Sequence, residues 1–533
     1  MNFLSAFTFE KLSVMSGEKI PVVVNANESG SLESGLSPEV SKIDMTAVEK
    51  GDPVLAKKMF LINNAIDEIG FTWYHAKLFC IAGYGYSVDS QMEMIQSSVH
   101  TYVAYQFGAT YPIDTQISYV GLLVGSIFWG FGGDLIGRKV CFNSSLLLTA
   151  LFGFLTGGMS SMSTYCIFMA LANFSAGGNL AMDVAVFLEY LPFKYQYMNT
   201  IMAAWWGVGQ TITNVLAWAF LPNFSCSGPD YCPSSINRGW RYTWYVNSAV
   251  VLASGLLRLF WFKLEETPKF LVSVGRDAEA VDNLQRLAKK YNRKCSLTLE
   301  QLEACGPITS EFYSVENDGF NYKKILNIVR HHCKILYQDK INGWSTSLIL
   351  ISWLFIGISY SIFYNFLYIY IAQHGGDTGT STYIVYRNSS VANFVGIFGP
   401  VLAGYMCLIP KVGRRLTMSF GALASMAILF GYTTVRTAAG DAGFSSATYF
   451  FINVYYGCLY AYTPEVLPAQ ARGTGVGLAL FAARVSGSFS PVTYYFGEQS
   501  GSSVPIWVCG GVIGSLAIVS ALLPFEPSKH RSV

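Results

Sequence analysis

The stretch Gly132-Gly133-Asp134-Leu135-Ile136-Gly137-Arg138-Lys139 decides the fold. It lies between two apolar runs, residues 115–131 and 141–162, and each run approaches the ~20 residues that a membrane-spanning helix needs. A loop this short forces the two helices to lie side by side and antiparallel. Because Asp134, Arg138 and Lys139 enter hydrocarbon only at a high cost in free energy, we expect them at a membrane surface. Gly133 and Gly137 permit a close backbone approach and unusual dihedral angles in this turn.

The same pattern recurs in the second half of the chain. Gly413-Arg414-Arg415 repeats Gly137-Arg138-Lys139 at a distance of 276 residues. Glu465-Val466-Leu467-Pro468 repeats Glu189-Tyr190-Leu191-Pro192 as Glu-x-x-Pro at the same distance. The alternative is two ordinary helix-end turns, but two matches at one offset predict two parallel halves, one of the plans known for membrane transporters.

These motifs resemble those of a known family. Gly130 to Lys139, read as Gly-x-x-x-Asp-x-x-Gly-Arg-Lys, resembles the loop between helices 2 and 3 of the major facilitator superfamily, although Leu135 replaces its usual basic residue. Asp67 to Phe71 resembles the start of helix 1 in transporters related to the synaptic-vesicle glycoproteins and in their fungal homologues. Glu266 to Leu271 and Tyr462 to Pro468 resemble sugar-porter motifs. The resemblance implies an all-α membrane protein with twelve transmembrane helices in two pseudo-repeated six-helix bundles.

The composition agrees with a membrane protein. Hydrophobic residues make up 52% of the 533 residues and charged residues only 13%, which excludes an ordinary soluble globule. A net charge of +2 gives no indication of a nucleic-acid partner. The sequence has no phosphate-cradling Walker loop, so we expect neither an ATP-driven pump nor an enzyme. The 11 cysteines lack the spacing of metal ligands, and we expect a monomer without cofactor or metal.

The order of polar and apolar runs predicts five segments. They are a disordered cytoplasmic tail (1–60), an N-terminal six-helix bundle (61–262), a cytoplasmic central loop with short helices (263–343), a C-terminal six-helix bundle (344–524) and a second cytoplasmic tail (525–533). The predicted spans are residues 78–99, 115–133, 141–162, 165–190, 200–221 and 241–262, followed by 345–372, 385–408, 416–436, 444–463, 474–496 and 504–524. Within the central loop, the pattern from Arg276 to Arg293 predicts a helix.

The distribution of basic residues predicts the orientation. Short loops on the side of the two termini carry more Lys and Arg than those on the other side, so we expect the termini in the cytoplasm. We expect the plasma membrane as the host membrane. Cys226 and Cys232 then lie outside, where a disulfide is allowed, beside the glycosylation sequon at Asn223. The alternative is that neither the cysteine pair nor the sequon is used.

The first predicted span has one polar stripe. Asp89, Glu93, Gln96 and His100 recur at spacings of 4, 3 and 4, which places them on one face of a helix. Such a stripe must face protein or water. We predict Asp89, Glu93 and Gln96 as solute-binding residues, and Asp89 and Glu93 also as proton-coupling residues. A structural hydrogen-bond cluster is the alternative, above all for His100.

The fourth predicted span offers a second polar pair, Asn179 and Asp183. A carboxylate this deep in a span needs a partner or a proton, so Asp183 is the favoured proton carrier, and Asn179 is a solute-binding candidate. Gly177 to Glu189 also resembles helix 4 of fungal phosphate:proton symporters. Asn179 stands there in place of an aspartate and Asp183 in place of a serine, which leaves a phosphate symporter only as an alternative.

Other spans carry stripes of aromatic and amide side chains, and the resemblance places helices 1, 4, 7 and 10 around a central cavity. Further solute-binding candidates are Gln210 and Asn214, Tyr360, Tyr364 and Asn365, and Asn453, Tyr456 and Tyr460. Packing is the alternative for such stripes, although buried phenol and amide groups need partners. Arg484 is a basic group deep in the second half, and it either balances a carboxylate or attracts an anionic solute.

The motif residues at the inner ends of the helices are predicted to form a gate. They are Gly133, Asp134, Gly137, Arg138, Lys139, Glu189 and Glu266 in the first half, and Gly413, Arg414, Arg415, Glu465 and Arg472 in the second. The sequence therefore predicts a secondary active transporter in the lipid bilayer that moves a small polar organic solute, such as a sugar or organic acid, by alternating access, as a proton-coupled symporter. A transporter-like receptor that moves nothing is the other alternative.

Overall fold

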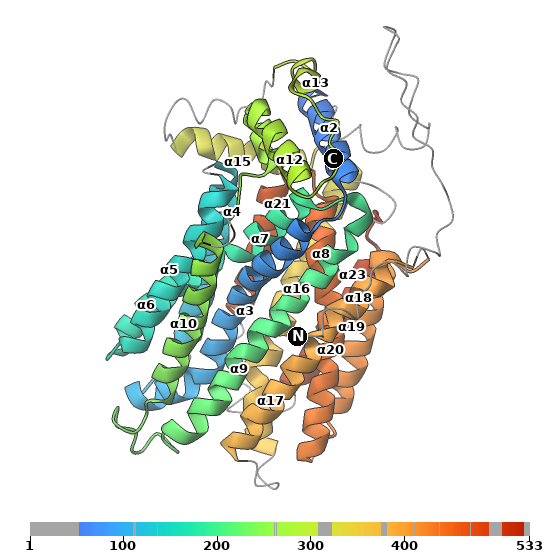
Figure 1. Ribbon diagram of the computed structural model, residues 1–533. Helices are drawn as coiled ribbons and strands as arrows, with labels where there is room; N and C mark the ends of the chain where they lie inside the picture. Colours follow the sequence, from blue (N-terminus) through green and yellow to red (C-terminus); the bar gives the residue numbers. More distant parts are fainter. Residues whose placement is uncertain are drawn as a thin grey trace. The chain divides into compact units, whose positions relative to one another are not determined.

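The computed structural model describes residues 53–109, 113–135, 137–260, 262, 264–307, 322–374, 381–409, 411–435, 437–468, 471–489 and 504–526. Regular structure in these ranges consists of helices, as predicted (Figure 1). The predicted tails lie outside the described residues up to residue 52 and from residue 527 onward.

Each predicted span coincides with a helix or a pair of helices. The first half contains α3 (Trp73–Phe107), α4 (Ile113–Leu135), α5 (Arg138–Gly158), α6 (Met162–Ala176) with α7 (Asn179–Tyr190), α8 (Tyr197–Met202) with α9 (Ala204–Phe224), and α10 (Gly239–Phe260). The second half contains α16 (Lys340–His374), α17 (Thr382–Gly396) with α18 (Phe398–Cys407), α19 (Gly413–Tyr432), α20 (Ala438–Val466), α21 (Arg472–Gly487) and α23 (Val504–Ala521). The last residues of the eleventh predicted span lie outside the described part. The halves meet mainly where α4 packs on α21 and α9 packs on α17.

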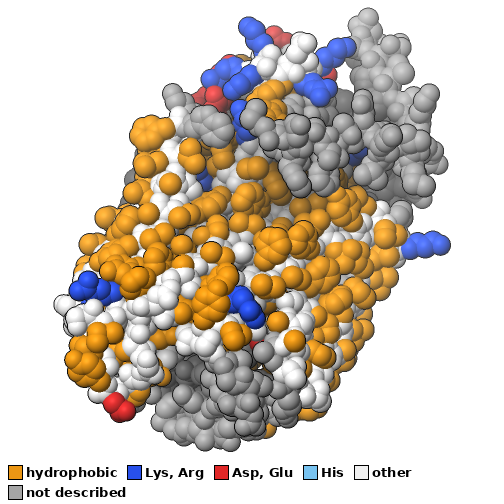
Figure 2. Space-filling view, turned by 60° about the horizontal axis from the view of Figure 1, so that its bottom comes forward, with side chains coloured by type: hydrophobic (Ala, Val, Ile, Leu, Met, Phe, Trp, Pro, Cys, Tyr) orange, Lys and Arg blue, Asp and Glu red, His pale blue; other side chains and the backbone are white. Residues whose placement is uncertain are grey.

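The outward surface of these helices suits a lipid environment. In the described part of the chain, five helical stretches are long and apolar enough by themselves to cross a membrane. Hydrophobic side chains cover much of the surface in Figure 2, and charged side chains gather at the end that carries the central-loop helices. The other spans are divided in two or carry polar residues that are buried inside the protein, as α3 does with Asp89 and Gln96.

The fourth span is divided because two glycines bring it against α4. Gly177 and Gly178 separate α6 from α7, and a Cβ atom at Gly178 would lie 2.1 Å from the Cβ of Trp129. Any larger residue at position 178 would push the two helices apart. This close contact fixes the start of α7, which carries Asn179 and Asp183.

Helix α2 (Pro53–Ile69) corrects the prediction of a disordered tail up to residue 60. Its apolar face, which includes Leu55, Met59, Ile62 and Ile66, is buried against the central-loop helices α11 (Pro268–Ser273), α12 (Asp277–Lys290) and α13 (Leu299–Glu303). The ammonium group of Lys58 lies 2.5 Å from Asp277 Oδ2. Spacings of 4, 3 and 4 on that face are a helical signal that the polar composition obscured. The helix predicted near 276–293 is confirmed as α12.

A second amphipathic helix joins the central loop to the second half. Helix α15 (Tyr322–Leu336) packs on α21, where His332 Nδ1 lies 2.8 Å from Thr474 Oγ1. Burial, together with the neighbouring His331, lowers the pKa of His332 to about 4, so the imidazole is neutral near pH 7. We call the end of the molecule that carries α2, α11, α12, α13 and α15 the loop face (Figure 1).

Cys226 and Cys232 form a disulfide in the connection between α9 and α10, at the end opposite the loop face. We expect a membrane-impermeant maleimide applied to intact cells to label these two cysteines only after mild reduction, because the bond consumes both thiols. Cys295 and Cys305 of the loop face should react only after permeabilisation. A Cys226→Ser/Cys232→Ser variant shows how much maleimide reacts with the other cysteines. Labelling of Cys305 in intact cells would reverse the predicted orientation.

Candidate functional site

Three charged side chains meet between the two halves. Arg484 on α21 donates through Nη2 to Asp89 Oδ2, and its Nη1 pairs with Glu93 Oε1. Asp89 and Glu93 are one turn apart on α3, so both carboxylates reach the same guanidinium group. The side chains of Asp89, Arg484 and Glu93 are only 0%, 8% and 12% exposed. We call these residues the ion triad; they tie α3 of the first half to α21 of the second.

One oxygen of the triad is left without a hydrogen bond. Asp89 Oδ1 is buried and has no hydrogen-bond partner, and the same holds for the hydroxyl of Tyr86, one turn earlier on α3. The carboxyl group of Asp89 interacts electrostatically with Tyr86, Tyr456 and Tyr460. A buried acceptor without a partner is costly, so this oxygen is available to a proton or a ligand donor.

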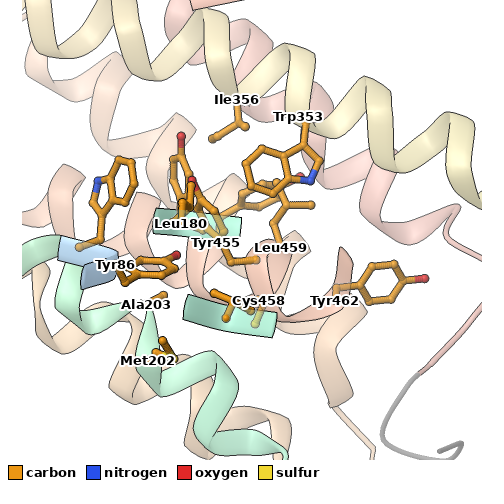
Figure 3. Packing of buried hydrophobic residues seen from close by; sticks show 14 of the residues in the cluster. Tyr86, Leu180, Met202, Ala203, Trp353, Ile356, Tyr455, Cys458, Leu459 and Tyr462 are labelled. Atoms are coloured by element: carbon orange, nitrogen blue, oxygen red, sulfur yellow. The ribbon is translucent and has the colours of Figure 1, made fainter. Parts of the chain in front are cut away.

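Six aromatic rings from both halves form one buried cluster that includes the three tyrosines near Asp89, and we call them the aromatic centre. They are Tyr86 on α3, Trp206 on α9, Trp353 and Tyr360 on α16, and Tyr456 and Tyr460 on α20. Tyr456 stacks on Tyr460 with ring centroids 5.3 Å apart and on Trp206 at 6.1 Å, and Tyr86 meets Tyr460 at 5.4 Å. Figure 3 shows Tyr86 and Trp353 in this buried cluster. The rings contact one another directly, so the centre has to open to admit a solute.

Side chains of α9 also form hydrogen bonds with side chains of the second half, at the aromatic centre and beyond it. Trp206 Nε1 donates to the hydroxyl of Tyr360 at 2.6 Å, and Gln210 Nε2 donates to the same oxygen. One turn further along α9, Asn214 Oδ1 accepts from Ser389 Oγ at 3.0 Å. The structure therefore brings Gln210 of α9 together with Tyr360 of α16. It also places Asp89 near Tyr456 and Tyr460 of α20.

Other predicted solute-binding residues bond within one half. Gln96 Nε2 donates to Asp114 Oδ2 at 2.7 Å, and His100 Nδ1 lies 2.8 Å from the same oxygen. Asn179 accepts from Ser145 on α5, and Asn453 Nδ2 donates to the carbonyl of Gly396 at 3.3 Å. These bonds hold helices of the same half together. The side chains of Tyr364 and Asn365 lie outside the described residues.

Asp183, the predicted proton carrier, has a partner that the sequence analysis missed. Arg258 Nη2 on α10 lies 2.9 Å from Asp183 Oδ1, and the two side chains are 2% and 0% exposed. Arg258 also donates to the carbonyls of Phe142 and Ile81, each at 2.9 Å, and lies 3.7 Å from the centroid of the Phe142 ring. The available signal was the position of Arg258 well inside the sixth predicted span, because a charge at that depth requires a partner.

The predicted gate of the first half is built around the start of α5. Arg138 Nη1 lies 2.9 Å from Glu189 Oε1. Glu266 accepts from the backbone nitrogens of Arg138 at 2.9 Å and Lys139 at 3.3 Å, so its carboxylate caps the positive end of the helix. Gly137 has φ of +105°, a value that other residues rarely adopt. The side chain of Asp134 lies outside the described residues.

The second half repeats this geometry. Arg414 Nη2 lies 2.8 Å from Glu465 Oε1, and Gly413 has φ of +60°. Glu526 accepts from the backbone nitrogens of Arg414 at 2.9 Å and Arg415 at 3.3 Å. Glu526 thus takes the role of Glu266, and the sequence analysis missed it. Both glutamates follow the last helix of their half and stand close before a proline, and this shared feature was the available signal.

A residue of the second gate also contacts the first half. Arg414 Nη1 donates to Thr200 Oγ1 on α8 at 3.0 Å, so it bridges the halves at the loop face. A recess in the protein is lined by the gate residues Arg138 and Arg472 and also by Trp353 and Tyr460 of the aromatic centre. The recess therefore reaches both the gate residues and the candidate solute site. Among the described residues, no group of three or more His, Cys, Asp or Glu is placed to hold a metal ion.

Comparison with known proteins gives the family. The family model of the Major Facilitator Superfamily matches residues 82–491. The chain belongs to the major facilitator superfamily. The siderochrome iron transporter 1 of Ceriporiopsis subvermispora is 37% identical to this superfamily member, over 90% of this chain and 93% of the relative. The synaptic vesicle 2-related protein of Pongo abelii is 23% identical, over 95% of this chain and 90% of the relative.

Solved structures confirm the fold of this superfamily member. The xylose transporter XylE from E. coli, in a partially occluded inward-open conformation, superposes with a TM-score of 0.59 over 84% of this chain and 97% of XylE, at 15% identity. The prediction of an all-α major facilitator fold is therefore confirmed. As a superfamily transporter, the chain is an integral membrane protein that carries small solutes.

Proposed function

We propose that this chain is a proton-coupled secondary transporter of a small organic solute, which binds at the aromatic centre. The observation that carries the proposal is the ion triad, in which Arg484 of one half holds Asp89 and Glu93 of the other. Alternating access in this architecture rocks one half against the other around a fixed site. A charge cluster that spans the seam must change its contacts when the halves rock.

The charge of the triad couples this motion to protons. Two ionised carboxylates and one guanidinium leave a net negative charge, which is costly to bury. One proton on either carboxylate makes the cluster neutral. A protonated triad is therefore easier to enclose than an ionised one. Uptake of a proton on one side of the membrane favours closure of the site, and the proton leaves after the site has opened to the other side.

Asp183 fits a structural role better than that of the carrier. Its carboxylate pairs with Arg258, which is itself held by two backbone carbonyls and the ring of Phe142. An arginine held by these contacts keeps the carboxylate of Asp183 in one position, as a structural ion pair does. We therefore place the coupling at the triad and assign the Asp183–Arg258 pair to the packing of α7 on α10 and α3.

In this proposal the solute is an organic molecule and not an inorganic ion. Aromatic walls with few polar groups suit an organic molecule. The net negative charge of the triad disfavours phosphate, and a relative is named a siderochrome iron transporter. The loop face is then the cytoplasmic side, and the plasma membrane is the proposed location.

Proteoliposomes with a pH-sensitive dye in the lumen test this function. We expect at least one of choline, xylose and a ferric hydroxamate to change the lumen pH when it is added outside. The Asp89→Asn/Glu93→Gln variant should lose the signal, since it cannot exchange a proton at the triad. Asp230→Asn, which removes an exposed carboxylate in the connection between α9 and α10, is the matched control.

Two outcomes contradict the proposal. Solutes that bind the purified protein but never move protons would favour the transporter-like receptor. A proton signal that survives in the double variant would place the coupling elsewhere, with Asp183 as the next carboxylate to replace.

A further inference from the structure

We infer that the aromatic centre binds an organic cation, such as a quaternary ammonium or protonated amine, and that this cation exchanges with the proton of the ion triad. The inference rests on the proposed function and names the class of its solute. It begins from the joint presence of a net negative triad, an unpartnered Asp89 oxygen and six aromatic rings at one buried place.

The charges around the centre favour a cation. Among the described residues that form the triad and the centre, the charged groups are Asp89 and Glu93 on α3 and Arg484 on α21. The other contributions from α3, α9, α16 and α20 are the phenol and indole rings of the centre and the amide of Gln210. Nearby in the first half, Asp183 pairs with Arg258, and Asp114 accepts a hydrogen bond from Gln96. An excess of one negative charge therefore remains at the centre, and it repels anionic solutes.

The aromatic rings of the centre provide a second attraction for organic cations. The face of an aromatic ring is electronegative, and cages of such rings recognise quaternary ammonium groups. Tyr456 and Tyr460 stack nearly parallel at 20°, and Trp353 meets Tyr460 edge to face with centroids 4.6 Å apart. Separation of these rings would expose several faces to one ligand. The carboxyl group of Asp89, whose Oδ1 has no hydrogen-bond partner, interacts electrostatically with the same two tyrosines.

A neutral polyol finds fewer partners at this place. A sugar hydroxyl needs both donors and acceptors that are free. The indole of Trp206 and the amide of Gln210 both donate to the hydroxyl of Tyr360, so these groups satisfy one another. Among the fully buried polar atoms at the centre, Asp89 Oδ1 and the hydroxyl of Tyr86 have no hydrogen-bond partner. An anionic acceptor next to aromatic faces matches an ammonium group better than a hydroxyl group.

Cation and proton compete because both neutralise the same excess charge. With a proton on Asp89 or Glu93, a bound monocation would give the buried centre a net positive charge. Binding of the cation therefore drives one proton from the carboxylate to solvent on the side that is open, and no covalent bond to the solute forms. The consequence is exchange of cation for proton, in place of the symport that the sequence predicts.

Titration of the purified full-length protein with choline in a weakly buffered, dye-containing detergent solution tests this inference. We expect choline to bind and to release up to one proton per protein, with an affinity that falls by up to about tenfold per unit of decreasing pH. Asp89→Asn should abolish proton release and weaken binding about tenfold or more, whereas the exposed Asp230→Asn should behave as the parent. Xylose and inorganic phosphate should not compete with choline.

Substitutions of Tyr456 distinguish a loss of choline binding from a loss of folding. Tyr456→Phe keeps the aromatic face and should keep choline binding within about threefold, whereas Tyr456→Leu should weaken it about tenfold, as expected for loss of a cation–π contact. Equal binding by the leucine and phenylalanine variants would overturn the role of the rings. Choline binding without proton release, or its displacement by xylose, would overturn the inference as a whole.

The two proposals fail in different ways. Proton flux driven by xylose in proteoliposomes, with no response to choline, would keep the proposed function and overturn the cation. Choline binding with proton release, but without flux in proteoliposomes, would keep the cation site and overturn transport.

Discussion

Replacement of Arg484 by methionine is expected to destabilise the folded protein by about 3–5 kcal/mol. The substitution leaves Asp89 and Glu93 buried one turn apart without their shared cation. Repulsion between the two carboxylates and the loss of their charge-assisted hydrogen bonds both lower the free energy of unfolding. Unfolding of the detergent-solubilised protein, followed by heat or denaturant, measures the change. Arg238→Met, at an exposed arginine before α10, is the matched control and should lie within about 0.5 kcal/mol of the parent.

A double-mutant cycle shows whether the loss comes from the triad. Asp89→Asn in the Arg484→Met background removes one of the stranded charges and should restore about 1–3 kcal/mol, since contacting residues couple on this scale. Solute-driven proton movement should be absent from both variants, because the coupling carboxylates no longer have their partner. Additive effects of the two substitutions would mean that Arg484 and Asp89 do not depend on each other.

The repeated loop motifs predicted the fold because local patterns determine it. Gly137 and Gly413 mark the same turn in each half, and both adopt positive φ. The apolar runs around these turns predicted spans that coincide with helices of the structure. Sequence reasoning failed at α2 because its polar neighbours concealed a short apolar face that is buried only by helices from the central loop.

The site was harder to predict because its partners are remote in the sequence. Arg484 and Asp89 are separated by 395 residues, and no spacing rule joins them. The spacing along α3 predicts a solute-binding role for Asp89, Glu93 and Gln96, yet the neighbours of these residues change along the helix. Asp89 meets α21, whereas Gln96 meets Asp114 on α4. A stripe at spacings of 4 and 3 therefore predicts burial of its residues but not their common role.

The two gates are alike in sequence, but the structure predicts that they contribute unequally. Arg414 and Glu465 are only 4% and 2% exposed, and Arg414 also bonds to Thr200 of the other half. Arg138 and Glu189 are 14% and 6% exposed, and this pair joins α5 to α7 within the first half. Arg414 therefore ties the two halves together at the loop face.

Substitution of Arg414 by alanine is thus expected to favour the conformation that is open at the loop face. A hydrogen bond to a charged group contributes about 1.5–3 kcal/mol, so loss of the Arg414–Thr200 bond should raise the accessibility of the recess by roughly 10- to 100-fold. The labelling rate of a Leu480→Cys variant, whose new thiol lines the recess, reports this opening from the loop-face side. Arg138→Ala should change the rate less, by no more than about fivefold, because its ion pair with Glu189 lies within the first half. Equal rates in the two alanine variants would show that the gate acts symmetrically, as the sequence repeat alone implies.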